Sequence, residues 1–140
     1  MASHHRRFLL STAAAVLSLA MTACMAAGPA KVGELQGEGP YQQFIVKYRE
    51  GSAPAREEAS VQARLDRTVG VSGLKSGAKA VALERKLRLS VDADVFRADR
   101  PLSKAEARQL MQSFAADPDV EYIEIDGIMK IMPVGGGLIR

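Results

Sequence analysis

Side chains that commonly carry out chemistry are scarce in this sequence. It holds one cysteine, Cys24, and two histidines, His4 and His5, among 140 residues. All three lie in a segment with the character of a secretory leader, so a chain without that leader has neither imidazole nor thiol. Such a chain lacks the residues of a Ser-His-Asp triad, a cysteine nucleophile, the usual zinc site and a disulfide. We expect a protein that is not an enzyme and that uses no cofactor and no metal.

Residues 1–27 have the three-part pattern of a secretory signal peptide. Arg6 and Arg7 give it a positive start, an apolar run continues to Met21, and small residues follow. This pattern predicts export to the periplasm or the extracellular space. Two alternatives remain open: a permanent membrane anchor, since the apolar stretch approaches the length of a span, and lipidation of Cys24 in a loosely lipobox-like setting. Contact with a membrane is expected only through this leader.

The charge of the chain gives little reason to expect a nucleic-acid partner. The net charge of +3 falls to about +1 when Arg6 and Arg7 are removed with the leader, and no basic run remains.

The rest of the sequence divides into three parts. Residues 28–40 are polar and rich in glycine, which predicts a linker. Residues 41–126 are expected to fold as a domain, and residues 127–140 to form an extended C-terminal tail.

Hydrophobic periodicity predicts four strands and two helices in the domain. Apolar alternation indicates the strands, and apolar residues at helical spacing indicate the helices. Pro54 suits the first turn of the first helix, and Ser103 with Glu106 forms a capping box at the start of the second. The expected elements are strand 42–48, a helix from Pro54 to about Gly70, strand 83–90, strand 93–98, a helix after Ser103, and strand 120–126.

Two of these strands carry clear one-sided patterns. Alternation places Phe44, Val46 and Tyr48 on one face of the first strand. In the second strand the same reasoning places three leucines on one face, with charged residues on the other. These leucines are Leu83, Leu87 and Leu89.

The order β-α-β-β-α-β predicts an α+β fold, the ferredoxin-like sandwich. In that fold an antiparallel four-stranded sheet carries two helices on one face and leaves the other face free. The fold alone does not fix a function. Strand 93–98 lacks the Gly-aromatic run of RNA-recognition modules, which disfavours RNA binding. Protein binding is favoured, and an exported ligand-binding or structural module is the alternative.

Residues 41–132 resemble the propeptide domain of subtilisin-like serine proteases, also called the proteinase propeptide inhibitors. The most specific part is DPDVEYIEID at residues 117–126, supported by FIVKY at residues 44–48. Residues 46–52 are similar to propeptides of Gram-negative bacterial exoproteases. The resemblance implies a secreted domain that binds and inhibits a subtilisin-like serine protease, and that assists its folding as an intramolecular chaperone.

The resemblance also implies which residues contact the protease. Glu124 and Asp126 match carboxylates that accept hydrogen bonds from helix N-termini of the enzyme, a favourable place for negative charge. They lie two residues apart on a strand and therefore share a face with Tyr122, while Ile123 and Ile125 point the other way. Judged from the residues alone, a solvated strand edge is the favoured interpretation of the two carboxylates.

The tail is implied to run through the substrate cleft of the protease. Its cleft-occupying residues are Met129, Lys130, Ile131 and Met132, with Met132 near the primary specificity pocket. Pro133 follows directly, and proline after the scissile bond disfavours cleavage, which suits an inhibitor that stays uncut. An apolar terminus without such a role is the alternative.

The printed sequence ends at Arg140, and no catalytic domain follows in it. On this basis we expect either a free-standing inhibitor or the front end of a truncated protease precursor.

Overall fold

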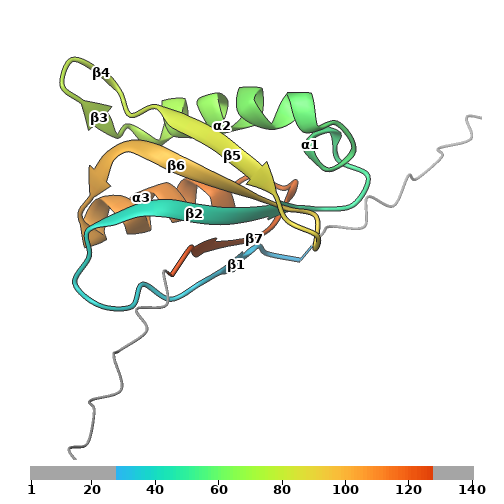
Figure 1. The fold of residues 1–140 in the computed structure, drawn as a ribbon, viewed down its shortest axis with the longest axis horizontal. Coiled ribbons are helices and arrows are strands. Elements are labelled where there is room, and N and C mark those ends of the chain that lie inside the picture. Colours follow the sequence, from blue (N-terminus) through green and yellow to red (C-terminus); the bar gives the residue numbers. More distant parts are fainter. Residues whose placement is uncertain (1–27, 128–140) are drawn as a thin grey trace, which may run out of the picture.

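The computed structural model describes residues 28–127 of the chain. In this range a five-stranded sheet has the strand order β1-β7-β2-β6-β5, and β3 and β4 form a separate two-stranded ribbon (Figure 1). The elements are β1 (Lys31–Val32), β2 (Tyr41–Tyr48), α1 (Ala53–Arg56), α2 (Glu58–Ser72), β3 (Lys75–Ser76), β4 (Lys79–Ala80), β5 (Leu83–Arg88), β6 (Ala93–Leu102), α3 (Lys104–Ala115) and β7 (Val120–Ile125).

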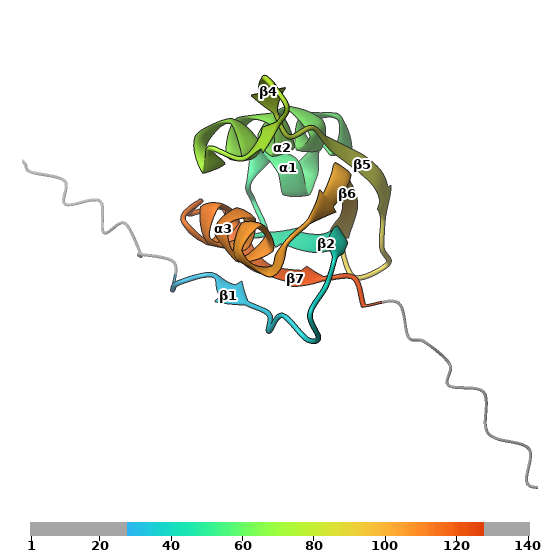
Figure 2. The same cartoon turned by 90° about the vertical axis from the view of Figure 1, so that its left-hand side faces the viewer.

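The predicted α+β, ferredoxin-like architecture is confirmed. Strands β7, β2, β6 and β5 are mutually antiparallel neighbours, and the helices lie on one side of their sheet (Figure 2). The arrangement differs in one detail, because β1 adds a fifth strand that runs parallel to β7. No helix within residues 28–127 is long and apolar enough to cross a membrane.

The core lies between the sheet and the helices. The predicted alternation of the first strand is correct, since Phe44, Val46 and Tyr48 are buried on the helix side of β2. Phe96 of β6 stacks between two other aromatic rings, with centroid distances of 5.5 Å to Phe44 and 5.0 Å to Phe114 of α3. Burial of such large side chains is the main source of stability in a domain without disulfides.

The first predicted helix is interrupted. Ser52 caps α1 through a hydrogen bond from the backbone N–H of Ala55, as expected for a chain with proline in the first turn. Glu57 then adopts an extended conformation, with φ −123° and ψ 105°, and separates α1 from α2. Helix α2 continues to Ser72 instead of ending near Gly70, because Gly73 provides the left-handed C-cap, with φ +75°.

The expected leucine face of the strand 83–90 is wrong for Leu87. Leu83 is buried against the helices, but Leu87 is 48% exposed. The pairing register between β5 and β6 shifts between Arg85 and Leu87, so an extra residue interrupts the two-residue alternation. Leu87 therefore lies on the face of the sheet opposite the helices.

The end of β6 differs from the prediction, whereas the start of α3 agrees with it. Strand β6 continues to Leu102 instead of ending at Ala98. The capping box of α3 is confirmed: the Ser103 hydroxyl accepts from the Glu106 N–H at 3.3 Å, and the Ser103 N–H donates to the Glu106 carboxylate at 2.9 Å. The predicted linker, residues 28–40, contributes strand β1 to the sheet.

Candidate functional site

The face of the sheet opposite the helices, called the open face below, is the first candidate site. In β6, Asp94 contacts arginines on the helix side and Phe96 lies in the core, so Val95 and Arg97 point to the open face. The same alternation in β2 assigns Gln43, Ile45 and Lys47 to it. Cross-strand pairing then arranges the open face in three rows.

The middle row is aliphatic and ends in a carboxylate. Leu87 pairs with Val95, Val95 with Ile45, and Ile45 with Glu124. Leu87 is half-exposed and Glu124 is exposed, whereas Val95 is only 4% exposed, because its neighbours cover it. An aliphatic ridge that ends in a negative charge can bury apolar area and accept hydrogen bonds from a protein partner.

The row toward the C-terminal end of β7 is polar. Arg97 pairs with Glu84 on one side and with Gln43 on the other, and Gln43 donates to the carboxylate of Asp126. The backbone N–H of Asp126 donates in turn to the carbonyl of Gln43 at 3.0 Å. The sheet therefore fixes Asp126 by its backbone and its side chain just beyond the end of β7. Arg97 has no carboxylate within 4.0 Å among residues 28–127 and donates to Gln42 at 3.0 Å.

The third row contains Lys47, which pairs with Ala93 on β6 and with Tyr122 on β7. Lys47 also lies 4.0 Å from the Glu121 carboxylate. Partial burial raises the pKa of Tyr122, and the negative charges of Glu124 and Glu121 raise it further. Tyr122 therefore stays a neutral hydroxyl at physiological pH, able to donate and accept a hydrogen bond.

The predicted site residues of the last strand share the open face in the structure. Tyr122 and Glu124 are two residues apart in β7, and Asp126 follows the strand. Ile123 is fully buried and Ile125 packs partly against the core, so both point away. Participation of Tyr122, Glu124 and Asp126 in a protein interface stays a prediction. Among residues 28–127, no group of three or more acidic residues is placed to hold a metal ion.

Several open-face residues were not predicted from the sequence. Ile45 and Val95 occupy the positions between the recognised core residues, so the alternation already contained the signal for them. Leu87 was assigned to the wrong face, since a bulge has no signature in the hydrophobic pattern.

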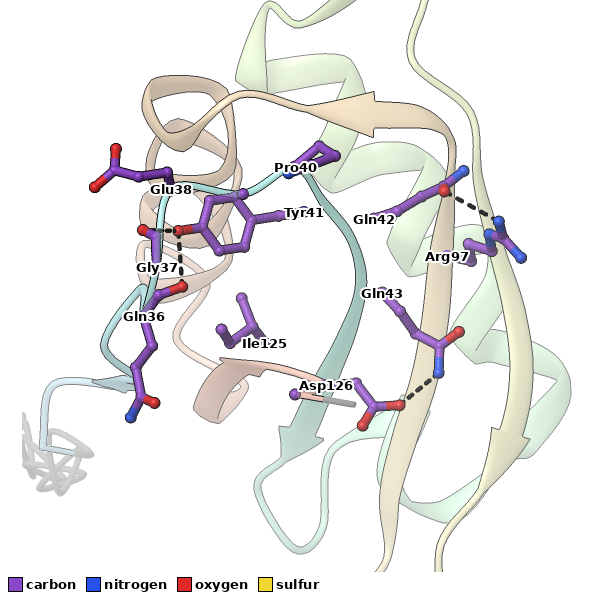
Figure 3. Close-up of a pocket in the computed structure, with 12 residues that line it drawn as sticks. Gln36, Gly37, Glu38, Pro40, Tyr41, Gln42, Gln43, Arg97, Ile125 and Asp126 are labelled. Atoms are coloured by element: carbon purple, nitrogen blue, oxygen red, sulfur yellow. Dashed lines mark hydrogen bonds between the residues drawn. The ribbon is translucent and has the colours of Figure 1, made fainter. Parts of the chain in front are cut away.

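A pocket of about 580 Å³ opens at the end of the polar row (Figure 3). Arg97, Gln43 and Asp126 line one side of it, and the loop before β2 lines the other, where the Tyr41 hydroxyl donates to backbone carbonyls. Gly127, the last residue that the structure describes, also lines the pocket.

The other predicted site residues lie outside the described part of the chain. These are Cys24, the candidate for lipidation, and the predicted cleft-occupying residues Met129, Lys130, Ile131 and Met132.

Comparison with known proteins relates the chain to part of a protease. No family model matches the sequence. A protein of Xanthomonas campestris pv. campestris, named "Extracellular protease", is 36% identical over 115 residues. The match includes 79% of this chain but only 20% of that protein, so the chain spans about one fifth of the length of this curated relative.

Proposed function

We propose that residues 41–126 form a propeptide-like domain that binds a subtilisin-like serine protease, inhibits it and assists its folding. The observation that carries this proposal is the similarity to one fifth of an extracellular protease. After Cys24 the sequence contains no histidine and no cysteine. Residues 41–126 therefore lack the side chains of a catalytic serine or cysteine protease centre, which fits a non-catalytic part of such an enzyme.

The open face supplies a docking surface of the required kind. Leu87 and Ile45, which flank the covered Val95, would pack on the surface of the protease, with burial worth about 25 cal/mol per Å² of apolar area before the costs of association. Glu124 and Asp126 would accept hydrogen bonds from helix N-termini of the enzyme. Each such carboxylate contributes about 0.3–1 kcal/mol when exposed, and more when partly buried.

The tail would act separately from the open face. Gly127 lies beside the fixed Asp126, so the following residues start at the end of the polar row. We propose that Met129 to Met132 enter the substrate cleft and block it. The leader would direct the protein out of the cytoplasm, consistent with the extracellular assignment in the name of the relative. The chain itself would need no cofactor and would not be an enzyme.

Variants of the full chain separate docking from occlusion. We expect Glu124→Ala and Asp126→Ala each to weaken binding to an active-site-blocked subtilisin-like protease by about 1–3 kcal/mol. Truncation after Gly127 is expected to preserve that binding and to abolish most inhibition of peptide cleavage. Binding is measured by calorimetry, and inhibition by the constant for a fluorogenic peptide.

Glu57→Ala is the matched control for the carboxylate variants. Glu57 is exposed on the helix side, and its carboxylate makes no capping hydrogen bond. The Glu57→Ala variant should bind the active-site-blocked protease as tightly as the parent does. Carboxylate variants that bind as tightly as Glu57→Ala would show that the last strand is only a solvated edge.

A further inference from the structure

The segment before the domain, residues 28–40, is called the arm here, and its strand β1 covers the outer edge of β7. Lys31 pairs with Tyr122 and Val32 with Ile123 in parallel register. The N–H of Gly33 then donates to the carbonyl of Ile123 at 2.8 Å. Without the arm, β7 would be an edge strand with unpaired backbone groups, the part of a sheet that most readily frays or pairs wrongly.

Contacts along the whole arm hold it in place. At its start, Arg49 donates to the carbonyl of Gly28. At its other end, the Tyr41 hydroxyl donates to Gln36 at 3.0 Å and to Gly37 at 2.7 Å (Figure 3). Between these points, two apolar side chains pack partly against the core; these are Ala30 and Leu35. The arm is therefore held against the domain by contacts at both ends and in its middle.

Gly33 of the arm lies close against Glu124 of the open face. A Cβ atom on Gly33 would lie 2.8 Å from Cβ of Glu124, closer than real Cβ atoms come, and 3.1 Å from its Cα. The backbone of Gly33 does not have a positive φ, so the need for glycine comes from this contact alone. Glu124 is also the residue that ends the aliphatic row.

The arm also widens the open face. Paired residues of neighbouring strands point to the same side of a sheet, so Lys31 lies on the open face beside Tyr122. Val32 points to the opposite side, where it lines a cavity with Lys104 and Met111 of α3. One side of β1 thus faces the proposed protein partner, and the other side faces the helix layer.

We propose that the arm is part of the docking surface. By pairing with β7 it fixes the positions of Tyr122 and Glu124, and its attachment to β7 therefore determines the affinity for the protein partner. The identity of that partner, a subtilisin-like protease, rests on the proposed function. A fixed surface binds more tightly than a fraying one, because less conformational freedom is lost on association.

The test compares two alanine substitutions in the full chain. Gly33→Ala forces the arm away from Glu124, whereas Gly70→Ala lies in α2, outside the arm, meets no atom within 4 Å and is the matched control. We expect backbone amides of residues 120–126 to exchange with solvent about tenfold faster in Gly33→Ala, and Kd for active-site-blocked protease to rise by a similar factor. Gly70→Ala should leave both quantities unchanged.

A third variant separates this role from general destabilisation. Val69 is buried in α2, away from β7, so Val69→Ala lowers stability without touching the arm. It should leave Kd unchanged well below its melting temperature. The proposal is overturned if Gly33→Ala leaves amide exchange in β7 unchanged, or if Val69→Ala weakens binding as much as Gly33→Ala does. Failure of the parent to bind any such protease would refute the proposed function, and the exchange comparison would still decide whether the arm fixes β7.

Discussion

Removing the charge of Asp94 should destabilise the domain more than any exposed substitution. The Asp94 side chain is only 1% exposed and lies between two arginines of β5. Its carboxylate accepts from Arg85 at 2.8 Å and from Arg88 at 2.9 and 3.2 Å. Arg88 also donates to the carbonyls of Pro54 and Ala55, so this cluster joins the β5–β6 hairpin to α1.

The expected loss of stability in Asp94→Asn comes from the two arginines, which would lose their carboxylate partner. Removing one partner of a buried ion pair typically costs about 3–5 kcal/mol, because the other charge is left uncompensated. The side chains of Arg85 and Arg88 are 18% and 19% exposed, so water can partly replace the lost partner. We therefore expect about 3 kcal/mol, a large part of the stability of a domain of this size.

The assay is urea unfolding of the full chain at neutral pH. Asp99→Asn is the matched control, since Asp99 lies on the same strand and is exposed. Its midpoint should match that of the parent, whereas Asp94→Asn should unfold at a lower urea concentration with an unchanged slope. A loss below about 1 kcal/mol for Asp94→Asn would contradict this expectation, because it would mean that the Asp94 ion pairs contribute no more than exposed surface pairs do.

Two other electrostatic predictions concern α2 and α3. Arg64 of α2 binds Asp117 at 2.7 and 2.9 Å, so Arg64→Gln should lower the free energy of unfolding by about 1–2 kcal/mol; an unchanged urea midpoint would contradict this. Hydrogen bonds from Arg100 and from the Ser103 N–H lower the pKa of Glu106 from 4.5 to about 2. Because the folded-state pKa is lowered, the stabilisation by Glu106 is present above pH 4.5 and is lost as the pH falls toward 2. The melting temperature of Glu106→Gln should therefore lie below that of the parent at pH 6, and the two should coincide near pH 2. A difference in melting temperature that stays constant between pH 6 and pH 2 would contradict this prediction.

Much of the fold could be predicted from local sequence patterns. The core positions Phe44, Val46 and Tyr48 repeat every two residues, and the capping box of Ser103 and Glu106 is a local signature. Both depend on residues close in sequence. The order of the elements then left few topologies, because four strands and two helices in this sequence are typical of the ferredoxin-like sandwich.

The features that were missed depend on distant residues. The bulge between Arg85 and Leu87 is defined by pairing with β6, so the strand itself carries no sign of it. Strand β1 has two residues in a glycine-rich segment, too short for any periodicity, and forms because β7 offers an uncovered edge. Gly33 resembled a linker glycine, although its contact with Glu124 requires it.

For the candidate site, the sequence predicted which residues of the last strand share a face. Tyr122, Glu124 and Asp126 share the open face as the alternation of the last strand implied. The aliphatic row beside them depends on the pairing of β5, β6, β2 and β7. Leu87, Val95 and Ile45 come together only through that pairing.

Thermal unfolding in the presence of a subtilisin-like protease tests the central claim most directly. The protease is blocked at its active site, so that it cannot digest the domain. A ligand that binds only the folded state at 100 times Kd adds about 2.7 kcal/mol, which raises Tm by about 10 °C or more in a domain of this size. We expect such a rise with a matching protease and none with a blocked chymotrypsin-like enzyme. A melting temperature that stays constant with a panel of blocked subtilisin-like proteases would contradict it.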